Sequence, residues 1–252
     1  ERENQPPKIS VVIPVYMEEK ILESTLSLYT PELRKKYNLE IIVSDGGSTD
    51  STLEIARRGA DLVVEHADPI RRQTISEGRN MGALHAQGTT LVFINGDTAP
   101  LAPDEFFHFI AEWDSRRANH SEAGALACYV DVDKKEKIFK DKLFYGFHNA
   151  YVRFLNSIGM GMGRGECQIV RSSVFKEVGG YNARVAAGED FDLYRRIGKI
   201  AKIRFASEIT VLESPRRFRK YGYLRILLTW TLNSLSVMFF SRSYSKQWEA
   251  VR

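Results

Sequence analysis

The chain has 252 residues, 43% apolar and 27% charged, which is typical of an ordinary globular protein large enough to bury a sizeable core. Its two cysteines are too few for a disulfide framework and lack the spacing of a zinc site, so we expect an intracellular setting. The net charge of +4 conceals a basic tail, because residues 199–252 carry 11 Lys and Arg against 3 Asp and Glu. Such a tail suits nucleic acid, anionic lipid or a phosphate ligand, or simply a solvated surface.

The first half of the chain alternates apolar runs with segments of helical spacing. Residues 1–8, ERENQPPK, are polar and indicate a frayed lead-in rather than a secretory signal peptide. Four runs rich in Val and Ile follow, at residues 8–15, 39–45, 60–66 and 89–95. Nearly continuous apolarity is typical of strands buried on both faces, and the alternation with helices predicts a mostly parallel sheet.

Two of the four predicted strands end in an Asp beside a Gly. Asp45 lies in "IIVSDGGSTDST" and Asp97 in "FINGDT". Ligands of open α/β sheets bind outside the carboxyl ends of the strands, where Asp45 could accept hydrogen bonds from a base or a ribose. A Rossmann dinucleotide site is a poor alternative, because the first strand ends in "PVYMEE" without the glycine fingerprint.

The second half begins with a predicted strand at residues 124–133 and a helix at residues 141–159. One stripe of this helix is apolar, and we expect it to pack in the core, with an apolar acceptor or a membrane as the alternative partner. The stripe consists of Leu143, Phe147, Tyr151, Phe154 and Ile158. The glycine-rich run at residues 159–166 lacks the Gly-Lys-Ser/Thr ending of a P-loop, so we expect a flexible loop.

Three acids in "GEDFDLYRR" fall at a predicted helix start. Glu189, Asp190 and Asp192 suit the positive end of the helix dipole, and they also suit a base that takes a proton from a hydroxyl. Downstream, "ESPRRFRKYG" (213–222) is predicted to be a loop. Its Arg and Lys side chains could neutralise a departing diphosphate, bind lipid headgroups or remain solvated.

The segment at residues 226–240 is apolar for 15 residues, whereas a spanning helix needs about 20. We therefore expect a helix that lies on a membrane or packs against another subunit, with packing on the protein's own body as the alternative. The adjacent "RRFRK" favours attraction to anionic lipid. We find no internal repeat or low-complexity linker, which predicts one continuous domain.

Several motifs in order resemble family-2 glycosyltransferases, which are inverting sugar transferases with a glycosyltransferase-A fold. They are "SVVIPVYMEE", "IIVSDGGSTDST", "GRNMGALHAQGTTLVFINGDT", "VFKEVGGYN" and "GEDFDLYRR", within residues 8–198. The resemblance implies an α/β fold with a Rossmann-like, mostly parallel central sheet, flanking helices and a helical C-terminal tail. We expect one catalytic domain at residues 1–215, with a nucleotide-sugar half (8–98) and an acceptor half (99–215), followed by a basic loop and an apolar or amphipathic C-terminal helix at residues 216–252.

The resemblance also implies roles for individual residues. Pro14, Val15, Tyr16 and Glu18 form the first nucleotide loop, and Asp45 with Gly46 faces the nucleobase. Arg79, Arg216 and Arg217 contribute to nucleotide-sugar binding. Asn95, Gly96 and Asp97 occupy the Asp-x-Asp motif, with Asp97 as metal ligand. Glu189 and Asp190 match the pair whose Asp is the catalytic base.

The implied reaction transfers a sugar from a UDP- or GDP-sugar to an acceptor hydroxyl, with Mg²⁺ or Mn²⁺ assisting departure of the diphosphate. The acceptor is a sugar or a lipid-linked molecule, no nucleic-acid partner is expected, and the expected location is cytoplasmic, with peripheral membrane contact through residues 216–240. Asn95 departs from the Asp-x-Asp motif. The Gln/Arg-x-x-Arg-Trp signature of processive synthases is also absent, and this absence argues for single-sugar transfer. A non-catalytic nucleotide-sugar-binding protein and a nucleotidyltransferase remain as alternatives.

Overall fold

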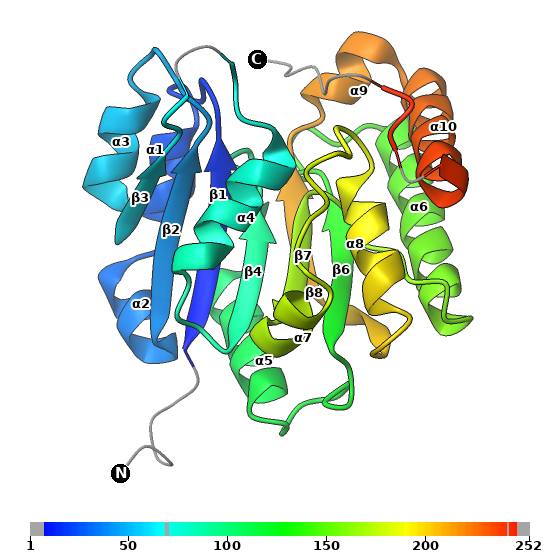
Figure 1. Cartoon of the computed structure of the whole chain (residues 1–252), viewed down its shortest axis with the longest axis horizontal. Coiled ribbons are helices and arrows are strands. Elements are labelled where there is room, and N and C mark those ends of the chain that lie inside the picture. The colour runs from blue at the N-terminus through cyan, green and yellow to red at the C-terminus, as the bar shows by residue number, and fades with distance from the viewer. Residues whose placement is uncertain (1–7, 69–70, 241, 246–252) are drawn as a thin grey trace.

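The computed structural model describes residues 8–68, 71–240 and 242–245, so the predicted lead-in, except its last residue, lies outside the described residues. An eight-stranded sheet forms its centre (Figure 1). The strands are β1 (Ile9–Val15), β2 (Leu39–Asp45), β3 (Leu62–Glu65), β4 (Thr90–Ile94), β5 (Thr98–Pro100), β6 (Ala125–Asp131), β7 (Cys167–Arg171) and β8 (Ile203–Glu213).

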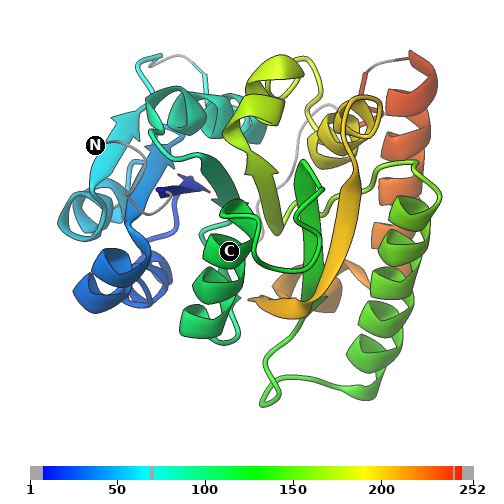
Figure 2. The ribbon, with the colours of Figure 1, turned by 90° about the horizontal axis from the view of Figure 1, so that it is seen from below.

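Helices cover both faces of this sheet (Figure 2). They are α1 (Leu22–Ser27), α2 (Pro31–Tyr37), α3 (Thr52–Gly59), α4 (Ile75–His85), α5 (Pro103–Asp114), α6 (Phe139–Ser157), α7 (Ser172–Glu177), α8 (Glu189–Ile197), α9 (Arg216–Tyr221) and α10 (Tyr223–Phe240).

The strand order β3-β2-β1-β4-β7-β6-β8-β5 divides the sheet into two halves. The strands β1 to β4 pair in parallel, as their apolar runs predict. The other half is mixed, because β7 is antiparallel to β4 and β6, whereas β8 is parallel to β6. After β4 the chain turns at residues 95–97, and β5 pairs antiparallel with β8 at the far edge. The Asn95-Gly96-Asp97 turn therefore joins the two halves.

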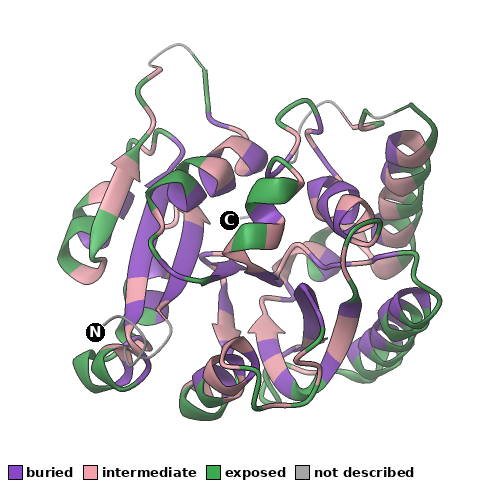
Figure 3. Ribbon diagram, turned by 60° about the horizontal axis from the view of Figure 1, so that its bottom comes forward, coloured by how far each residue is buried: buried purple, intermediate pink, exposed green. Residues whose placement is uncertain are grey.

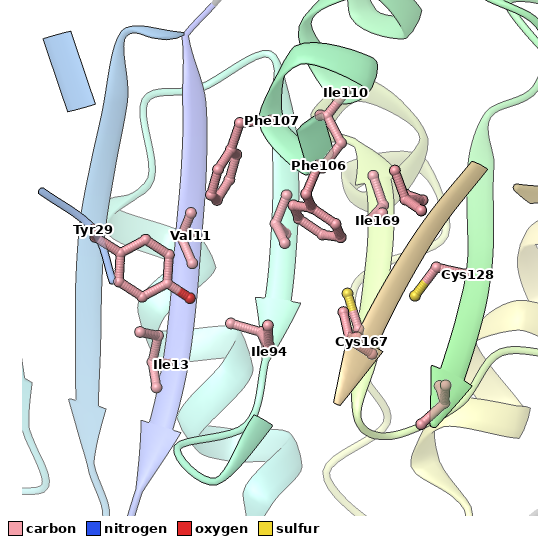
Figure 4. Packing of buried hydrophobic residues seen from close by; sticks show 14 of the residues in the cluster. Val11, Ile13, Tyr29, Ile94, Phe106, Phe107, Ile110, Cys128, Cys167 and Ile169 are labelled. Atoms are coloured by element: carbon pink, nitrogen blue, oxygen red, sulfur yellow. The ribbon is translucent and has the colours of Figure 1, made fainter. Parts of the chain in front are cut away.

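Alternation along β1 sends side chains into two apolar layers. Val11 and Ile13 join the cluster beneath α1, α2 and α5, where Phe106 and Phe107 also pack (Figure 4). Val12 points to the other face and joins the cluster beneath α4, α7 and α8. Burial on both faces fixes the register of β1 and holds its carboxyl end at residues 14–16 in one place.

Helix α6 contradicts the expectation of core packing. Its predicted apolar stripe is exposed to solvent, at 67% for Leu143, 60% for Phe147 and 58% for Phe154 (Figure 3). The opposite side of the helix is buried and includes Phe144 and Val152. The reason is that α6 is apolar on more than one side, so periodicity alone could not show which side meets the sheet.

The structure also differs from the two predicted loops, the basic segment after Pro215 and the glycine-rich run. The basic segment after Pro215 is not a loop but the short helix α9, because Phe218 is buried among aromatic side chains and anchors the turn. In the glycine-rich run, a Cβ on Gly163 would lie 2.6 Å from the ring of Tyr194. Close approach of the backbone to α8 therefore gives a steric reason for glycine there.

Helix α10 is long and apolar enough, by length and composition, to cross a membrane, and among the described residues no other helix is. In its 18-residue window, of mean hydropathy 1.2, 17% of the residues are buried. The buried side, with Ile226, Asn233 and Val237, packs on the protein body, including α8 and α9.

Candidate active site

A cavity of about 310 Å³ opens at the carboxyl ends of β1, β2 and β4, where open α/β sheets bind ligands. We call it the donor cavity. Among its walls are these residues singled out from the sequence: Pro14, Val15, Tyr16, Glu18, Gly46, Asn95, Gly96, Asp97, Arg216 and Arg217. A Cβ on Gly96 would lie 3.2 Å from Val15 Cγ1, so glycine lets the turn after β4 approach the end of β1. The fold thus brings together most of the predicted nucleotide residues.

Asp45 lies beside this cavity but is buried, with 2% of its surface exposed. Its Oδ2 atom accepts hydrogen bonds from the backbone N–H groups of Gly47 and Ser48, both at 2.9 Å. Its Oδ1 atom is buried without a hydrogen-bond partner among the described residues. Asp45 therefore shapes the turn after β2 and leaves one buried carboxylate oxygen without a hydrogen-bond partner beside the donor cavity.

Sequence reasoning missed Arg72 and Gln73, which also line the donor cavity. The Arg72 guanidinium carbon lies 4.3 Å from the centre of the Tyr16 ring, in cation–π contact. These residues precede α4 and carry no motif of their own, so no signal in the sequence joined them to Tyr16. Together Tyr16 and Arg72 offer planar surfaces on which a nucleobase can stack.

Arg216 brings a positive charge to the predicted metal ligand. Its Nη2 atom donates to Asp97 Oδ2 at 3.1 Å and lies 3.9 Å from Glu18 Oε2. Helix α9 begins at this residue, so the placement of α9 sets the position of the guanidinium. A cation bound at Asp97 would have to share the carboxylate with Arg216 or displace it.

The acidic side chains that line the donor cavity offer carboxylate oxygens, which are the ligands that a hard divalent cation prefers. Arg164 holds Glu166 Oε2 and Glu213 Oε1 in ion pairs at 3.1 Å and 2.8 Å, whereas the Asp97 side chain remains 32% exposed. Among the described residues, no group of three or more His, Cys, Asp and Glu side chains is arranged to hold a metal. Asp97 therefore fits a metal that also takes ligands from a bound diphosphate.

Arg79 is fully buried and lines a second cavity rather than the donor cavity. Its Nη1 atom donates to Glu189 Oε1 at 2.9 Å, and its Nη2 atom donates to Asn95 Oδ1 at 3.0 Å. A capping box, in which Thr74 and Glu77 bond to each other's backbone N–H, starts α4 one turn earlier. Arg79 thus ties the turn after β4 to Glu189 of α8.

The second cavity, of about 270 Å³, adjoins the first, because Ile75, Asn95, Glu166 and Trp230 line both. Asp190 lies in its wall, at the N-terminus of α8. Burial, followed by the negative charges of Glu189 and Glu166, raises the pKa of Asp190 to about 7. A carboxylate with such a pKa can accept a proton near neutral pH.

The other two acids of this motif have structural partners. Glu189 pairs with Arg79, and Asp192 Oδ2 accepts from Arg196 Nε at 2.9 Å one turn along the helix. Sequence reasoning missed Glu166, which lies directly before β7, and Trp230, which lies on α10. Their shared position depends on long-range packing, which no local pattern reveals.

Comparison with known proteins agrees with this geometry. The family model described as glycosyl transferase family 2 matches residues 10–179. The chain is 27% identical to the succinoglycan biosynthesis protein ExoA of Rhizobium meliloti over 213 residues, which cover 82% of this chain and 63% of ExoA. The chain thus spans less than two thirds of the length of the curated relatives that it matches.

Two solved structures share the fold. The mannosyltransferase PcManGT of Pyrobaculum calidifontis, in complex with GDP-Man and Mn²⁺, is 20% identical with a TM-score of 0.67, covering 92% of this chain and 63% of that chain. Glucosyl-3-phosphoglycerate synthase of Mycobacterium tuberculosis, with Mn²⁺, UDP and phosphoglyceric acid, is 18% identical with a TM-score of 0.58, covering 92% and 78%. Likenesses at this level of identity show the glycosyltransferase-A fold.

Proposed function

The chain belongs to glycosyltransferase family 2, and from this premise we propose that it transfers a sugar from a nucleoside-diphosphate sugar to an acceptor hydroxyl, with inversion at the anomeric carbon. One observation carries the proposal: Asp190, with a pKa near 7, lines a cavity that adjoins the predicted nucleotide site. A base so placed can reach a hydroxyl that approaches the donor from the side opposite the diphosphate.

The donor binds mainly in the half formed by residues 8–98, to which α9 adds Arg216 and Arg217. The acceptor binds in the half formed by residues 99–215, which α10 completes. Tyr16 and Arg72 stack on the base, and Asp45 accepts a hydrogen bond from it. Uracil and guanine both present N–H donors for such a carboxylate. Complexes of fold relatives with GDP-Man and with UDP support a donor of one of these two kinds.

In the proposed reaction, Asp190 takes the proton of the acceptor hydroxyl as its oxygen forms a bond to the anomeric carbon. The bond from that carbon to the diphosphate oxygen breaks, and the diphosphate leaves with the electron pair. Arg216 and Arg217 line the donor cavity and offset the charge that develops on the leaving group. Arg79 keeps Glu189 ion-paired, so Asp190 is the acid of the pair assigned to proton transfer.

A divalent cation, Mg²⁺ or Mn²⁺, would act as a Lewis acid on the phosphate oxygens, and Asp97 would hold it. Mn²⁺ in the complexes of the two fold relatives supports this assignment. Because Arg216 already pairs with Asp97, we expect the cation to bind together with the diphosphate rather than before it.

Incubation with a panel of UDP- and GDP-sugars and Mn²⁺ tests the proposal. We expect slow release of nucleoside diphosphate from one donor through hydrolysis, since water replaces the missing acceptor. Stabilisation of the fold by a donor, measured as a rise in Tm, would show binding. Binding without turnover for every donor would favour a non-catalytic nucleotide-sugar-binding protein instead.

We also propose that residues 216–240 contact a membrane surface. The segment contains five Arg and Lys and no acid, and α10 exposes Leu224, Leu228 and Phe239 at 71%, 55% and 70%. The helix lies along the body with its other side buried, which favours contact along the membrane over crossing it. Co-sedimentation with anionic liposomes at low salt and release at high salt is the expected result; no co-sedimentation would contradict it.

A further inference from the structure

The second cavity continues as a groove between α6 and α10, and we propose that this groove binds the hydrocarbon chain of an amphiphilic acceptor whose hydroxyl meets Asp190. The inference rests on the proposed transfer reaction and specifies its acceptor class. We call the channel the α6–α10 groove and define it by Tyr151 and Leu155 of α6 and by Leu227, Trp230, Leu235 and Met238 of α10.

The α6–α10 groove runs from a polar end to an apolar end. At the inner end, Asp190 is joined by Arg164 and His148, whose Nη1 and Nδ1 atoms have no hydrogen-bond partner among the described residues. Burial lowers the pKa of His148 to about 3, so its ring is neutral at physiological pH and can both donate and accept a hydrogen bond. This end therefore offers polar contacts to a headgroup or hydroxyl.

The outer end offers few such contacts. Tyr151 and Leu235, at its mouth, are 43% and 44% exposed and come from the two facing helices. Met160 and Met162 from the adjoining loop add flexible apolar walls. Thr231 and Ser234 of α10 also line this part, and the Thr231 hydroxyl already donates to the Leu227 carbonyl. A sugar here would lose more hydrogen bonds to water than it gains, whereas a hydrocarbon chain would gain by burial.

The groove opens onto the exposed apolar sides of both helices, which lie side by side at one edge of the molecule (Figure 2). In the wall of the groove, the Trp230 ring of α10 makes tilted contacts with the rings of Phe144 and His148 of α6, which hold the two helices together. The exposed stripe of α6 and the exposed leucines of α10 therefore flank the entrance. An amphiphile can pass from a bilayer into the groove without its chain crossing a polar surface.

The charges on α6 and α10 favour an anionic bilayer as the membrane from which the amphiphile enters the groove. Their exposed charged side chains are Lys140, Lys142, Arg153 and Arg225, all of them positive. The single acid, Asp141 of α6, is fully buried and paired with Arg219. A basic border around an apolar entrance is complementary to anionic headgroups above acyl chains.

The probe is dodecyl phosphate brominated at the end of its chain, used below its micelle concentration and without donor. Bromine quenches tryptophan on contact, and Trp230 lines the groove. We expect saturable quenching in the wild type and loss of that quenching in Trp230→Phe, while inorganic phosphate does not compete. Competition by inorganic phosphate would assign the binding to the headgroup alone and overturn the proposal.

Two leucines of α10 provide a matched pair. Leu235 lies at the groove and Leu232 does not, yet they are 44% and 45% exposed. We expect Leu235→Gln to weaken probe binding about ten-fold, the effect of removing much of one buried leucine contact, and Leu232→Gln to leave it unchanged. Equal affinities in the two variants would overturn the groove assignment, as would absence of quenching in the wild type.

Separate readouts distinguish this inference from the transfer reaction. Donor binding is followed by the rise in Tm with a nucleoside diphosphate and Mn²⁺. Donor turnover without probe binding would overturn the amphiphilic acceptor and leave the transfer reaction standing. A dimer in sedimentation velocity that dissociates in both leucine variants would assign the apolar face to a second copy and overturn the inference as well.

Discussion

Asp190 has an environment that sets its protonation close to physiological pH. Its pKa is raised to about 7, so the fraction able to accept a proton grows as pH rises through this value. We expect kcat/KM for the donor reaction to increase roughly ten-fold per pH unit below pH 7 and to level off above it. A profile measured from about pH 5 to pH 9 checks this, and a flat profile would remove Asp190 as the titrating base.

Asn95 is the residue that departs from the family motif. It accepts a hydrogen bond from Arg79, so the turn keeps its shape without a carboxylate there. We expect Asn95→Asp to tighten Mn²⁺ binding in the absence of nucleotide, by several-fold, because it adds one negative charge near Asp97. Titration with Mn²⁺ followed by electron paramagnetic resonance measures this, and turnover should persist.

Asn119→Asp is the matched control, because it adds the same charge on an exposed residue of another loop. Equal Mn²⁺ affinity in both variants would show that Asn95 does not face the metal. The sequence placed Asn95 through its motif, but it could not show the Arg79 contact. That contact joins residues 16 positions apart through packing of α4 on the sheet.

Gly163, in the loop before β7, and Gly146, in α6, have different surroundings. Gly163 packs its backbone against Tyr194 of α8. At Gly146 in α6, by contrast, no atom other than the adjacent backbone of its own helix lies within 4 Å of the place where a Cβ would be. We expect Gly163→Ala to destabilise the fold by about 1–3 kcal/mol through overpacking. Gly146→Ala should stabilise it by up to about 1 kcal/mol through helix propensity. Urea unfolding compares the two, and equal midpoints would contradict the packing described for the loop.

Some helices and strands can be predicted from local sequence alone, whereas others depend on contacts between distant parts of the chain. The strands β1, β2 and β4 are short apolar runs bounded by turn residues, and the sequence placed their ends to within a residue. The strand β7 directly follows the glycine-rich run and is not predicted from the sequence, because its pairing partners β4 and β6 are distant in sequence. Helix α6 was found, but its exposed side was assigned to the core because neighbours decide which apolar side is buried.

At the scale of the whole molecule, the nucleotide half could be predicted because its residues follow consecutive parallel strands that end at one edge. The second cavity could not, because α8, α10 and the loop before β7 meet there from separate parts of the chain. The Asn95-Gly96-Asp97 turn joins these halves by carrying the chain from the middle of the sheet to β5 at its far edge. The proposed reaction takes place where the two cavities adjoin.

Asp190 is the proposed proton acceptor at the boundary between the two cavities, and a comparison of two conservative variants on α8 tests this role. Asp190→Asn and Asp192→Asn change carboxylates two positions apart on α8, but Asp192 pairs with Arg196 and does not line either cavity. We predict that Asp190→Asn lowers kcat by about 10²- to 10⁴-fold with unchanged affinity for the nucleoside diphosphate, and that Asp192→Asn keeps near wild-type kcat. Full turnover in Asp190→Asn would show that Asp190 is not the base.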